Sequence, residues 1–526
     1  MVFHILASNR DSVSLCRASG LTSRVYLEYR YTSSAIRQEV PADVKPALPG
    51  WGFLRPARNR SGIAAAPSSE VVHNREHRHR RKQMNVVPES QPFAQRNTAL
   101  RSSWRRVADV IAAFALVAMT PMALAQPVEI AYNTFLDPNN TNDPRAAAQT
   151  KMIAEFERQN PNIKVRVVVD PTGANGARTL RTHADSPDIV RATTFQMPEF
   201  VATGALLQLD DLVKRDKIDQ NDWLLPLAAG TVGGHVFGLQ QDYRIPILIY
   251  RKHLLEEAKV TPPRTWTDVC ETGAKLSKNN VVGYAIPIGT TGGIGGAQAF
   301  GEFHLSTLLA APDGKYFGDD NKTIAFSKES FVRGAQVIKD QFLKCKSTPM
   351  ASLQFGFNEV HDGLRSGTIA MATFGLYRYR SIQAQGAGAD LSWAPPPGFT
   401  PDERETVYGF QLTINSFSKQ KDAAWQFVKF MTTPGAQAIA AQGGEVVARA
   451  SAYNDPYFAS PQGRDQRAWA DLIKTRGRQV NYSIIQSTFH QIVADAFQRM
   501  ILRNTTPEDA YQEVITKYNE ALEKTK

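Results

Sequence analysis

The pattern of apolar and polar positions over residues 128–169 predicts a strand, a helix and a second strand. Residues 128–132 alternate as an extended segment does, and residues 163–169 alternate again with charged side chains between the apolar ones. Between them, Asp143-Pro144 is typical of a helix start. Apolar side chains then recur at four-residue spacing, at Ala148, Met152 and Phe156. This order predicts a βαβ unit, and hence a largely parallel sheet covered by helices.

The same α/β alternation continues along the chain. Residues 187–190 predict a further short strand and residues 197–207 a helix. Residues 236–250 form a long extended stretch interrupted by Pro246, and a helix is expected around residues 253–258. We find no internal repeat and no segment typical of a flexible interdomain linker. Two lobes joined by several tight chain crossings, which would act as a hinge, are therefore expected.

The distribution of charge argues against nucleic-acid binding. The formal net charge of the 526 residues is +11. However, residues 1–125 hold 18 Lys and Arg against 8 Asp and Glu, which leaves 43 against 42 for the remainder. The main body is electrically balanced, so a nucleic-acid partner is not expected.

The cysteine and histidine content indicates no metal site. The three cysteines are Cys16, Cys270 and Cys345, without a C-x-x-C pair or a Cys/His spacing suited to zinc. Cys270 and Cys345 would form one disulfide in an oxidising compartment. The alternative is that they are two unrelated buried thiols. No metal and no cofactor are expected.

An export signal is predicted directly before the main body. Four arginines in residues 96–106 precede an apolar run over residues 110–119, which ends before Pro121 and Ala123-Leu124-Ala125. This is the order of a secretory signal with an A-x-A cleavage site, so cleavage is expected after Ala125. A membrane anchor is the alternative, but the run is about half of the roughly 20 residues needed to cross a bilayer.

The signal lies unusually far from the first residue. A start at Met84 would give residues 84–125 the ordinary organisation of a signal peptide. Residues 1–83 are then expected to be a non-native or disordered extension. Their most conspicuous feature is the basic run over residues 73–82, for which nucleic-acid or metal binding is the alternative reading.

A series of short motifs resembles one family of proteins over residues 128–522. The motifs are IAEFERQNPNIKV (153–165), SPDIV (186–190), GALLQLDD (204–211), FGL (237–239), LIYRK (248–252), PPRTW (262–266), VGYA (282–285), LRSGTIAM (364–371), AAWQFVKFM (423–431), PGAQ (434–437) and VAR (447–449). In this order they resemble the extracellular solute-binding proteins of family 1, the maltose-binding-like periplasmic components of ABC importers. The resemblance implies a periplasmic protein that delivers a solute to inner-membrane permease subunits, acting as a monomer.

The family's fold implies two α/β lobes of the periplasmic binding protein type, type II-like. Each lobe would hold a helix-covered, mostly parallel sheet, and three hinge crossings would connect the two. By similarity, the first lobe comprises residues 126–246 and 412–447. The second lobe comprises residues 247–411 and 448–526.

The resemblance also implies a ligand site at the ends of the strands and at the crossings. The loops after two early strands supply two pairs of residues, and the first crossing supplies three polar side chains. Tyr377 stands where the family's stacking tryptophan stands, with Arg378 and Arg380 nearby that would suit an anionic sugar. The predicted ligand-binding residues are Asn133, Phe135, Thr194, Phe195, Asp242, Tyr243, Arg244, Tyr377, Gly409, Phe410 and Glu445. The alternative for each loop residue is a solvated or core position.

These features predict capture of a carbohydrate or sugar-derived solute by closure of the two lobes, without catalysis. A secreted hydrolase is disfavoured because neither G-x-S-x-G nor H-E-x-x-H occurs. No complete phosphate-binding glycine loop occurs either. The alternatives are a receptor for a sensor kinase, and a non-sugar solute such as a polyamine or an organic acid.

Overall fold

The computed structural model describes residues 126–170, 186–225, 230–289, 294–310 and 314–525. These belong to the second of the two units into which the chain divides, residues 109–526. The predicted extension (1–83), signal peptide (84–125) and cleavage site lie outside the described residues. In the described ranges no helix is both long and apolar enough to cross a membrane.

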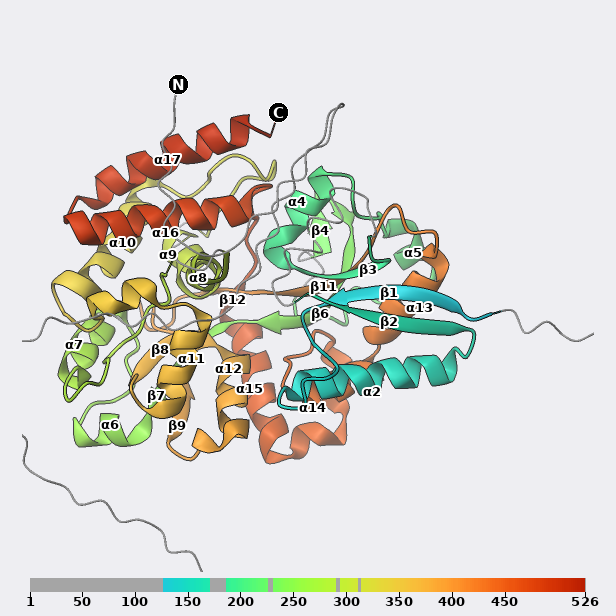
Figure 1. Cartoon of the computed structure of the whole chain (residues 1–526), viewed down its shortest axis with the longest axis horizontal. Coiled ribbons are helices and arrows are strands. Elements are labelled where there is room, and N and C mark those ends of the chain that lie inside the picture. The colour runs from blue at the N-terminus through green and yellow to red at the C-terminus, as the bar shows by residue number, and fades with distance from the viewer. Residues whose placement is uncertain (1–125, 171–185, 226–229, 290–293, 311–313, 526) are drawn as a thin grey trace, which may run out of the picture. The chain divides into compact units, whose positions relative to one another are not determined.

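The first β-sheet has five strands in the order β2-β1-β3-β11-β6 (Figure 1). Their bounds are β1 Val128–Thr134, β2 Ile163–Val169, β3 Ile189–Thr193, β6 Gly238–Arg244 and β11 Tyr408–Ile414. Strand β1 pairs in parallel with β2 and with β3, which confirms the predicted opening βαβ unit. Strand β11 lies between β3 and β6 and is antiparallel to both.

The second β-sheet has three strands in the order β8-β7-β9. Their bounds are β7 Pro246–Arg251, β8 Met371–Gly375 and β9 Leu391–Ala394. Strand β7 is antiparallel to both neighbours, so the prediction of a mostly parallel sheet is wrong here.

Strands β7 and β11 both enter their sheets from a strand of a different sheet, β7 from the first sheet and β11 from the separate two-stranded sheet of β10 (Glu405–Thr406) and β12 (Gly477–Arg478). Strand β7 follows β6 after the single residue Ile245, and β11 enters the first sheet from the segment that follows β10. A helical crossover returns the chain to the same end of a sheet and so makes strands parallel. A strand that enters from a neighbouring sheet starts at the edge where the sheets meet, and its direction is therefore not fixed by such a crossover.

Helices α2 and α13 cover one face of the first sheet through aromatic contacts. The ring of Phe427 lies 5.2 Å from that of Tyr132 on β1 and 5.1 Å from that of Phe156 on α2. As predicted, Asp143 caps α2 by accepting a hydrogen bond from the backbone N–H of Arg145. The helices around this sheet are α2 Pro144–Gln159, α4 Met197–Ala202, α5 Asp210–Arg215, α13 Lys421–Met431 and α14 Pro434–Gln442.

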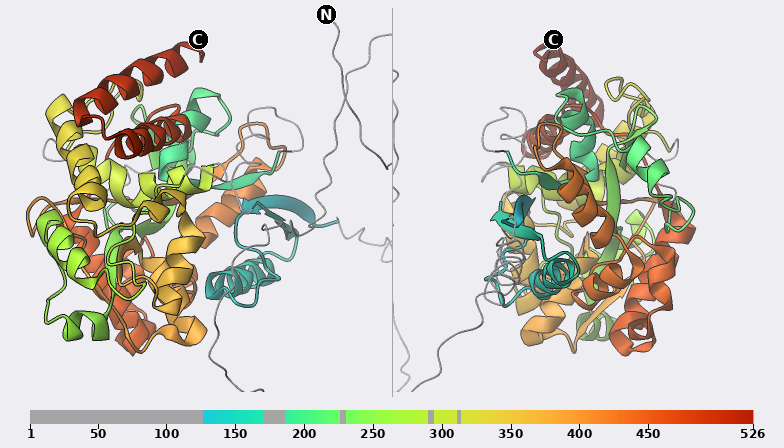
Figure 2. Two further views of the ribbon diagram at one scale, coloured as in Figure 1. Left: turned by 60° about the vertical axis from the view of Figure 1, so that its left-hand side comes forward. Right: turned by 90° about the vertical axis from the view of Figure 1, so that its right-hand side faces the viewer.

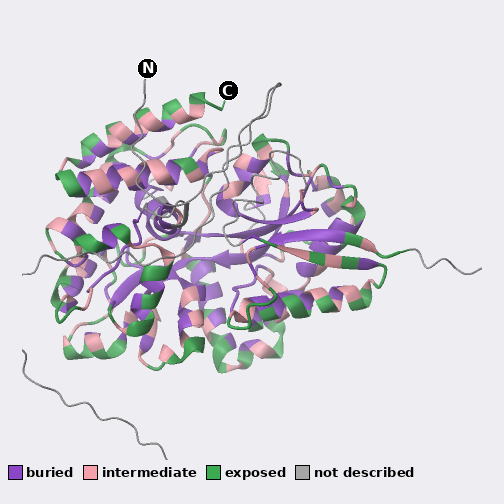
Figure 3. Ribbon diagram, viewed as in Figure 1, coloured by how far each residue is buried: buried purple, intermediate pink, exposed green. Residues whose placement is uncertain are grey.

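Further helices belong to the part of the molecule that holds the second sheet: α11 and α12 contact this sheet, and α10, α16 and α17 pack together (Figures 1 and 2). Phe331 on α10 lies 5.5 Å from Phe497 on α16 and 5.4 Å from Tyr511 on α17, between ring centroids. The outer faces of α2 and α17 are exposed, whereas the central strands are buried (Figure 3). These helices are α6 Lys252–Glu257, α7 Trp266–Leu276, α8 Ile294–Phe300, α9 Ser306–Ala310, α10 Lys328–Leu343, α11 Phe357–Ser366, α12 Leu376–Ile382, α15 Pro461–Arg476, α16 Gln486–Arg503 and α17 Pro507–Glu523.

Short elements complete the described chain. The 3₁₀ turns are η1 Thr194–Gln196, η4 Met350–Gln354, η6 Ala450–Asn454 and η7 Pro456–Ala459, and the π-helical turns are η3 Gly301–Leu305 and η5 Gln383–Ala387. Two-residue strands are β4 Thr231–Val232, β5 His235–Val236, β10 Glu405–Thr406 and β12 Gly477–Arg478.

The chain passes between the two sheets at segments that lie side by side. Tyr243 donates its backbone N–H to Val446 O over 2.8 Å, which joins the end of β6 to the segment after α14. Tyr408 pairs with Arg244, so β11 begins beside the same place. The lobe boundary predicted at residue 412 falls within β11, because the strand starts at Tyr408.

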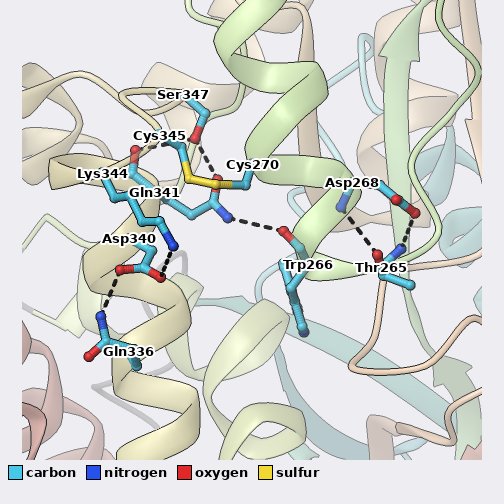
Figure 4. Close-up of a disulfide and its surroundings, with 10 residues drawn as sticks. All are labelled: Thr265, Trp266, Asp268, Cys270, Gln336, Asp340, Gln341, Lys344, Cys345 and Ser347. Carbon is cyan, nitrogen blue, oxygen red and sulfur yellow. Dashed lines mark hydrogen bonds and ion pairs between the residues drawn. A yellow bond between two sulfur atoms is a disulfide. The ribbon is translucent and has the colours of Figure 1, made fainter.

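A disulfide joins Cys270 on α7 to Cys345, just after α10 (Figure 4). The two Cα atoms are 5.3 Å apart and the cysteines are separated by 75 positions. Nearby, Gln341 donates its side-chain N–H to Trp266 O over 3.4 Å, a second link between the same helices. The structure thus favours the paired cysteines over two unrelated thiols.

Candidate functional site

Four charged side chains form a buried network at the boundary end of the first sheet. Arg191 on β3 donates from Nη2 to Asp242 Oδ2 over 2.6 Å and to Glu445 Oε1 over 3.0 Å. Arg244 Nε lies 3.3 Å from Asp242 Oδ1, and Arg244 Nη2 lies 3.3 Å from Glu445 Oε2. Two guanidinium groups and two carboxylates therefore compensate one another in a place from which water is excluded.

A β-bulge brings Asp242 and Arg244 to the same face of the sheet as Arg191. Opposite β11, Asp242 pairs with Phe410 and Gln240 with Gln411, so Gln241 is an extra residue. Without it, the alternation along β6 would turn Asp242 and Arg244 to the other face. A bulge next to a site re-aims side chains in this way.

Glu445 reaches the network from the turn after α14. Gly444 has φ of 100°, a conformation that side chains other than glycine rarely adopt, and it reverses the chain there. Burial raises the pKa of both carboxyls. The pKa of Asp242 is raised overall, because burial and the neighbouring Glu445 both disfavour its charged form. The pKa of Glu445 is instead lowered to about 2, because Arg244 and Arg191 stabilise its charged form.

Aromatic rings enclose the guanidinium groups. Phe135, just beyond β1, and Phe410 on β11 have ring centroids 5.1 Å apart. The Cζ atom of Arg191 lies 4.9 Å from the first centroid and 4.5 Å from the second. Arg244 Cζ also lies 4.5 Å from the Phe410 centroid, so one ring contacts both cations.

Tyr377, which follows the second sheet, completes the cluster. Its ring centroid lies 4.3 Å from Arg244 Cζ and 5.1 Å from the Cζ of Arg145 on α2. Gly375 permits this position, because a Cβ atom there would be 2.4 Å from Tyr377 Cε1. Arg145 is held by Asp143 through two hydrogen bonds of 3.0 and 2.7 Å. Tyr377, on the helix that follows β8, is therefore in direct contact with Arg244 of β6 in the first sheet.

The structure brings together six of the predicted site residues. These are Phe135, Asp242, Arg244, Tyr377, Phe410 and Glu445.

Two more predicted residues, Thr194 and Gly409, lie beside the cluster. Thr194 donates its hydroxyl to Gly409 O over 3.2 Å. At Gly409 a Cβ atom would be 2.0 Å from Asp242 O, so glycine there permits close packing of β11 against β6. This contact is within the first sheet, whereas the sequence suggested close approach to a ligand.

Three predicted residues point elsewhere. Tyr243 occupies the other face of β6 and donates its hydroxyl to Leu225 O over 3.1 Å. Asn133 is buried and pairs in register with Val190 rather than with the network. Phe195 packs near His490 on α16, with ring centroids 5.7 Å apart.

Sequence reasoning missed Arg191 and Arg145. Arg191 stands between Val190 and Ala192 in an apolar strand, where a charge is costly unless it is paired. The apolar neighbours of Arg191 were therefore the sequence signal that an acidic side chain is buried beside it. Arg145 carried no such signal, because an arginine in the first turn of an exposed helix is ordinary.

The described residues offer no alternative metal chemistry. Among them, no group of three or more His, Cys, Asp or Glu side chains is arranged to hold a metal ion. The candidate site is a cluster of paired charges bordered by the rings of Phe135, Phe410 and Tyr377.

Comparison with known families decides the classification. The model of the family "Bacterial extracellular solute-binding protein" matches residues 139–438. The chain belongs to this family. The resemblance read from the sequence motifs is confirmed, and the family is one of non-enzymatic solute-binding proteins.

Relatives of this solute-binding protein are distant. A probable amino-acid ABC transporter periplasmic-binding protein, y4oP of Sinorhizobium fredii, is 24% identical over 53% of this chain and 63% of its own length. The maltotriose-binding protein of Pyrococcus abyssi is 23% identical over 53% of this chain and 58% of its own length. The chain thus spans about three fifths of the length of these curated relatives.

A solved structure supports the fold of this solute-binding protein along most of its length. The GacH receptor of Streptomyces glaucescens, determined unliganded and in complex with acarbose, covers 76% of this chain and 99% of its own. The TM-score is 0.62 at 20% sequence identity. This likeness shows the α/β fold of the periplasmic binding proteins.

Proposed function

We propose that the chain is the substrate-binding component of an ABC importer, capturing a carbohydrate or sugar-derived solute and delivering it to a membrane permease. One observation carries the proposal: Tyr377 on α12, which follows β8 of the second sheet, packs on Arg145 of α2 and on Arg244 of β6 in the first sheet. A ligand inserted at this boundary would bridge the two halves. The family membership, the maltotriose-binding relative and the acarbose complex of the GacH receptor support a carbohydrate.

The chemistry of the site suits such a ligand. A sugar ring offers an apolar C–H face to an aromatic ring and hydroxyl groups to polar side chains. Phe135, Phe410 and Tyr377 are the aromatic groups, and Arg244 and Glu445 are the adjacent polar ones. Asn133, Tyr243 and Phe195 lie outside this cluster and do not contact the ligand directly.

The mechanism is binding by closure. The first lobe is formed by the first sheet with α2, α4, α5, α13 and α14, and the second by the remaining described elements. The lobes open at the three crossings, admit the solute and close on it, because the solute binds the closed state more tightly than the open one. The closed form then docks on the permease.

Export to the periplasm completes the proposal. The signal at residues 84–125 would be removed after Ala125, and the Cys270–Cys345 disulfide suits an oxidising compartment. Amino-terminal sequencing of the protein from the periplasmic fraction is expected to begin at Gln126. A periplasmic protein that begins elsewhere would overturn the predicted cleavage site.

The binding test is a thermal-shift screen of the purified protein against neutral sugars, sugar acids, sugar phosphates, polyamines and amino acids. A solute at 100 times its Kd is expected to add about 2.7 kcal/mol to the free energy of unfolding. Small-angle scattering should show a smaller radius of gyration when that solute is present.

Variants decide whether the proposed site is used. Tyr377→Ala should abolish the shift, whereas Phe417→Ala, which removes an exposed aromatic outside the cluster, should keep it. A protein that responds to no sugar, or a Tyr377→Ala variant that binds normally, would refute the proposal. Ligand-stimulated ATP hydrolysis by the reconstituted permease separates an importer component from a sensor-kinase receptor.

A further inference from the structure

Arg378 adds a positive charge that the cluster does not neutralise. It follows Tyr377 on α12, and its Cζ atom lies 5.4 Å from the Tyr377 centroid and 5.4 Å from the Phe357 centroid. Its Nε atom is buried and hydrogen-bonds to no described residue. No ion pair links Arg378 to a carboxylate of the described chain.

The other guanidinium groups around Tyr377 are matched. Arg145 pairs with Asp143, and Arg244 pairs with Asp242 and Glu445. With Arg378, three cations lie within 5.4 Å of the centre of one ring. Arg145 and Arg244 have carboxylate partners, so the charge that an added anion would compensate is that of Arg378.

Glu302 is the nearby carboxyl that remains. It accepts a hydrogen bond from Gln298 Nε2 over 2.7 Å and interacts electrostatically with Arg378. Burial raises the pKa of its carboxyl. The two groups form no ion pair in the described chain, so Glu302 does not hold the Arg378 guanidinium.

The groups of the buried network that lack a hydrogen-bond partner are donors. Both oxygens of Asp242 accept hydrogen bonds from arginine, and so do both oxygens of Glu445. By contrast, Nε and Nη1 of Arg191 are buried without a hydrogen-bond partner. A ligand that supplies acceptor oxygens complements these groups better than one that supplies donors.

We propose that the solute carries an anionic oxygen group, a carboxylate or a phosphate, which Arg378 binds beside Tyr377. This inference rests on the proposed function and narrows its ligand class to acidic or phosphorylated sugars. A neutral sugar enclosed at the same place would leave the charge of Arg378 uncompensated, so the arginine selects between otherwise similar solutes.

The test compares matched ligands on the full-length protein. Glucose, glucuronate and glucose 6-phosphate form one set, and galactose, galacturonate and galactose 6-phosphate form another. Titration calorimetry should show an anionic member binding about 10- to 100-fold more tightly than its neutral counterpart, the range expected for a charge-assisted hydrogen bond. The two anionic arms distinguish a carboxylate from a phosphate.

Two variants assign the preference to one side chain. Arg378→Gln should remove the preference for the anion, and Arg378→Lys should restore part of it. The matched control is Arg380→Gln on the same helix, because Arg380 lines a separate cavity of about 540 Å³ with Gln383 and Asp465. This control should retain the preference.

The outcomes separate the two proposals. If neutral sugars bind as tightly as their anionic partners, or if Arg378→Gln keeps the preference, the anionic ligand is refuted and the sugar receptor stands. If no sugar of either set or of the wider panel binds, the proposed function fails, and this inference fails with it.

Discussion

Arg191 and Asp242 form an ion pair of 2.6 Å whose side chains are only 1% and 0% exposed. Removing one member of such a pair leaves a buried charge without compensation. We therefore expect Arg191→Met to lower the free energy of unfolding by about 3–5 kcal/mol, measured by urea denaturation.

The matched control for this pair is Arg166→Met in the same sheet. Arg166 pairs with Glu129 over 2.7 Å, but both side chains are 58% exposed. The loss should be under about 1 kcal/mol. Equal losses in the two variants would contradict the role assigned to burial.

Gly409→Ala should destabilise the pairing of β11 with β6. The added Cβ would lie 2.0 Å from Asp242 O and 2.5 Å from Gln240 Nε2. Overpacking of this kind costs about 1–3 kcal/mol, to be read from denaturant midpoints at constant slope. Gly435→Ala on α14 is the control, because nothing lies within 4 Å of its added Cβ, and it should be neutral or slightly stabilising. A Gly409→Ala protein as stable as the unmodified one would show that the strands can separate without cost.

Glu405 should make stability depend on pH. Burial raises the pKa of its carboxyl from 4.5 to about 8 in the folded protein. A raised pKa means that the folded state holds the proton more tightly, so this stabilisation is complete below about pH 4.5 and is lost as the pH rises through about 8.

The variant Glu405→Gln isolates this effect, because it mimics the protonated form at every pH. Relative to the variant, the unmodified protein should lose up to about 1.4 kcal/mol per pH unit within that window. Urea titrations at pH 5, 6, 7 and 8 give the difference. A difference that stays constant with pH would mean that Glu405 titrates normally.

Loss of the disulfide should destabilise the protein by about 3–5 kcal/mol, because the bond closes a long loop in the unfolded chain. The variant Cys270→Ser/Cys345→Ser should unfold at lower urea concentration than the oxidised protein. A reductant should bring the unmodified protein to the same midpoint and leave the variant unchanged. If the reductant changes neither protein, the cysteines are not joined in solution.

Local patterns gave β2 and the start of α2 accurately, whereas the helix expected over residues 197–207 ends at Ala202. Strand β2 begins and ends with the alternation of apolar and charged residues. Helix α2 begins at Pro144, directly after its N-cap residue Asp143. These elements follow from forces that act between near neighbours along the chain. Strand direction in the second sheet was misjudged, because it depends on where the chain enters the sheet, which no local pattern records.

The site was predicted in part for the same reason. Asp242 and Arg244 were chosen because they lie near a crossing, and Tyr243 was chosen with them. The bulge at Gln241 sends Tyr243 to the other face, and it is visible only once β6 is paired with β11. Arg191 was missed because its partners are 51 and 254 positions away.

The position of β11 in the first sheet sets the order in which the protein can fold. The strand fills the place between β3 and β6, and Thr413 bonds to a β3 residue 223 positions earlier. In the proposed export, a chain that emerges from the translocation channel N-terminus first exposes the facing edges of β3 and β6 until residue 414 has passed. Until then the charges of Arg191 and Asp242 remain in contact with water, and a periplasmic chaperone would have those edges to bind.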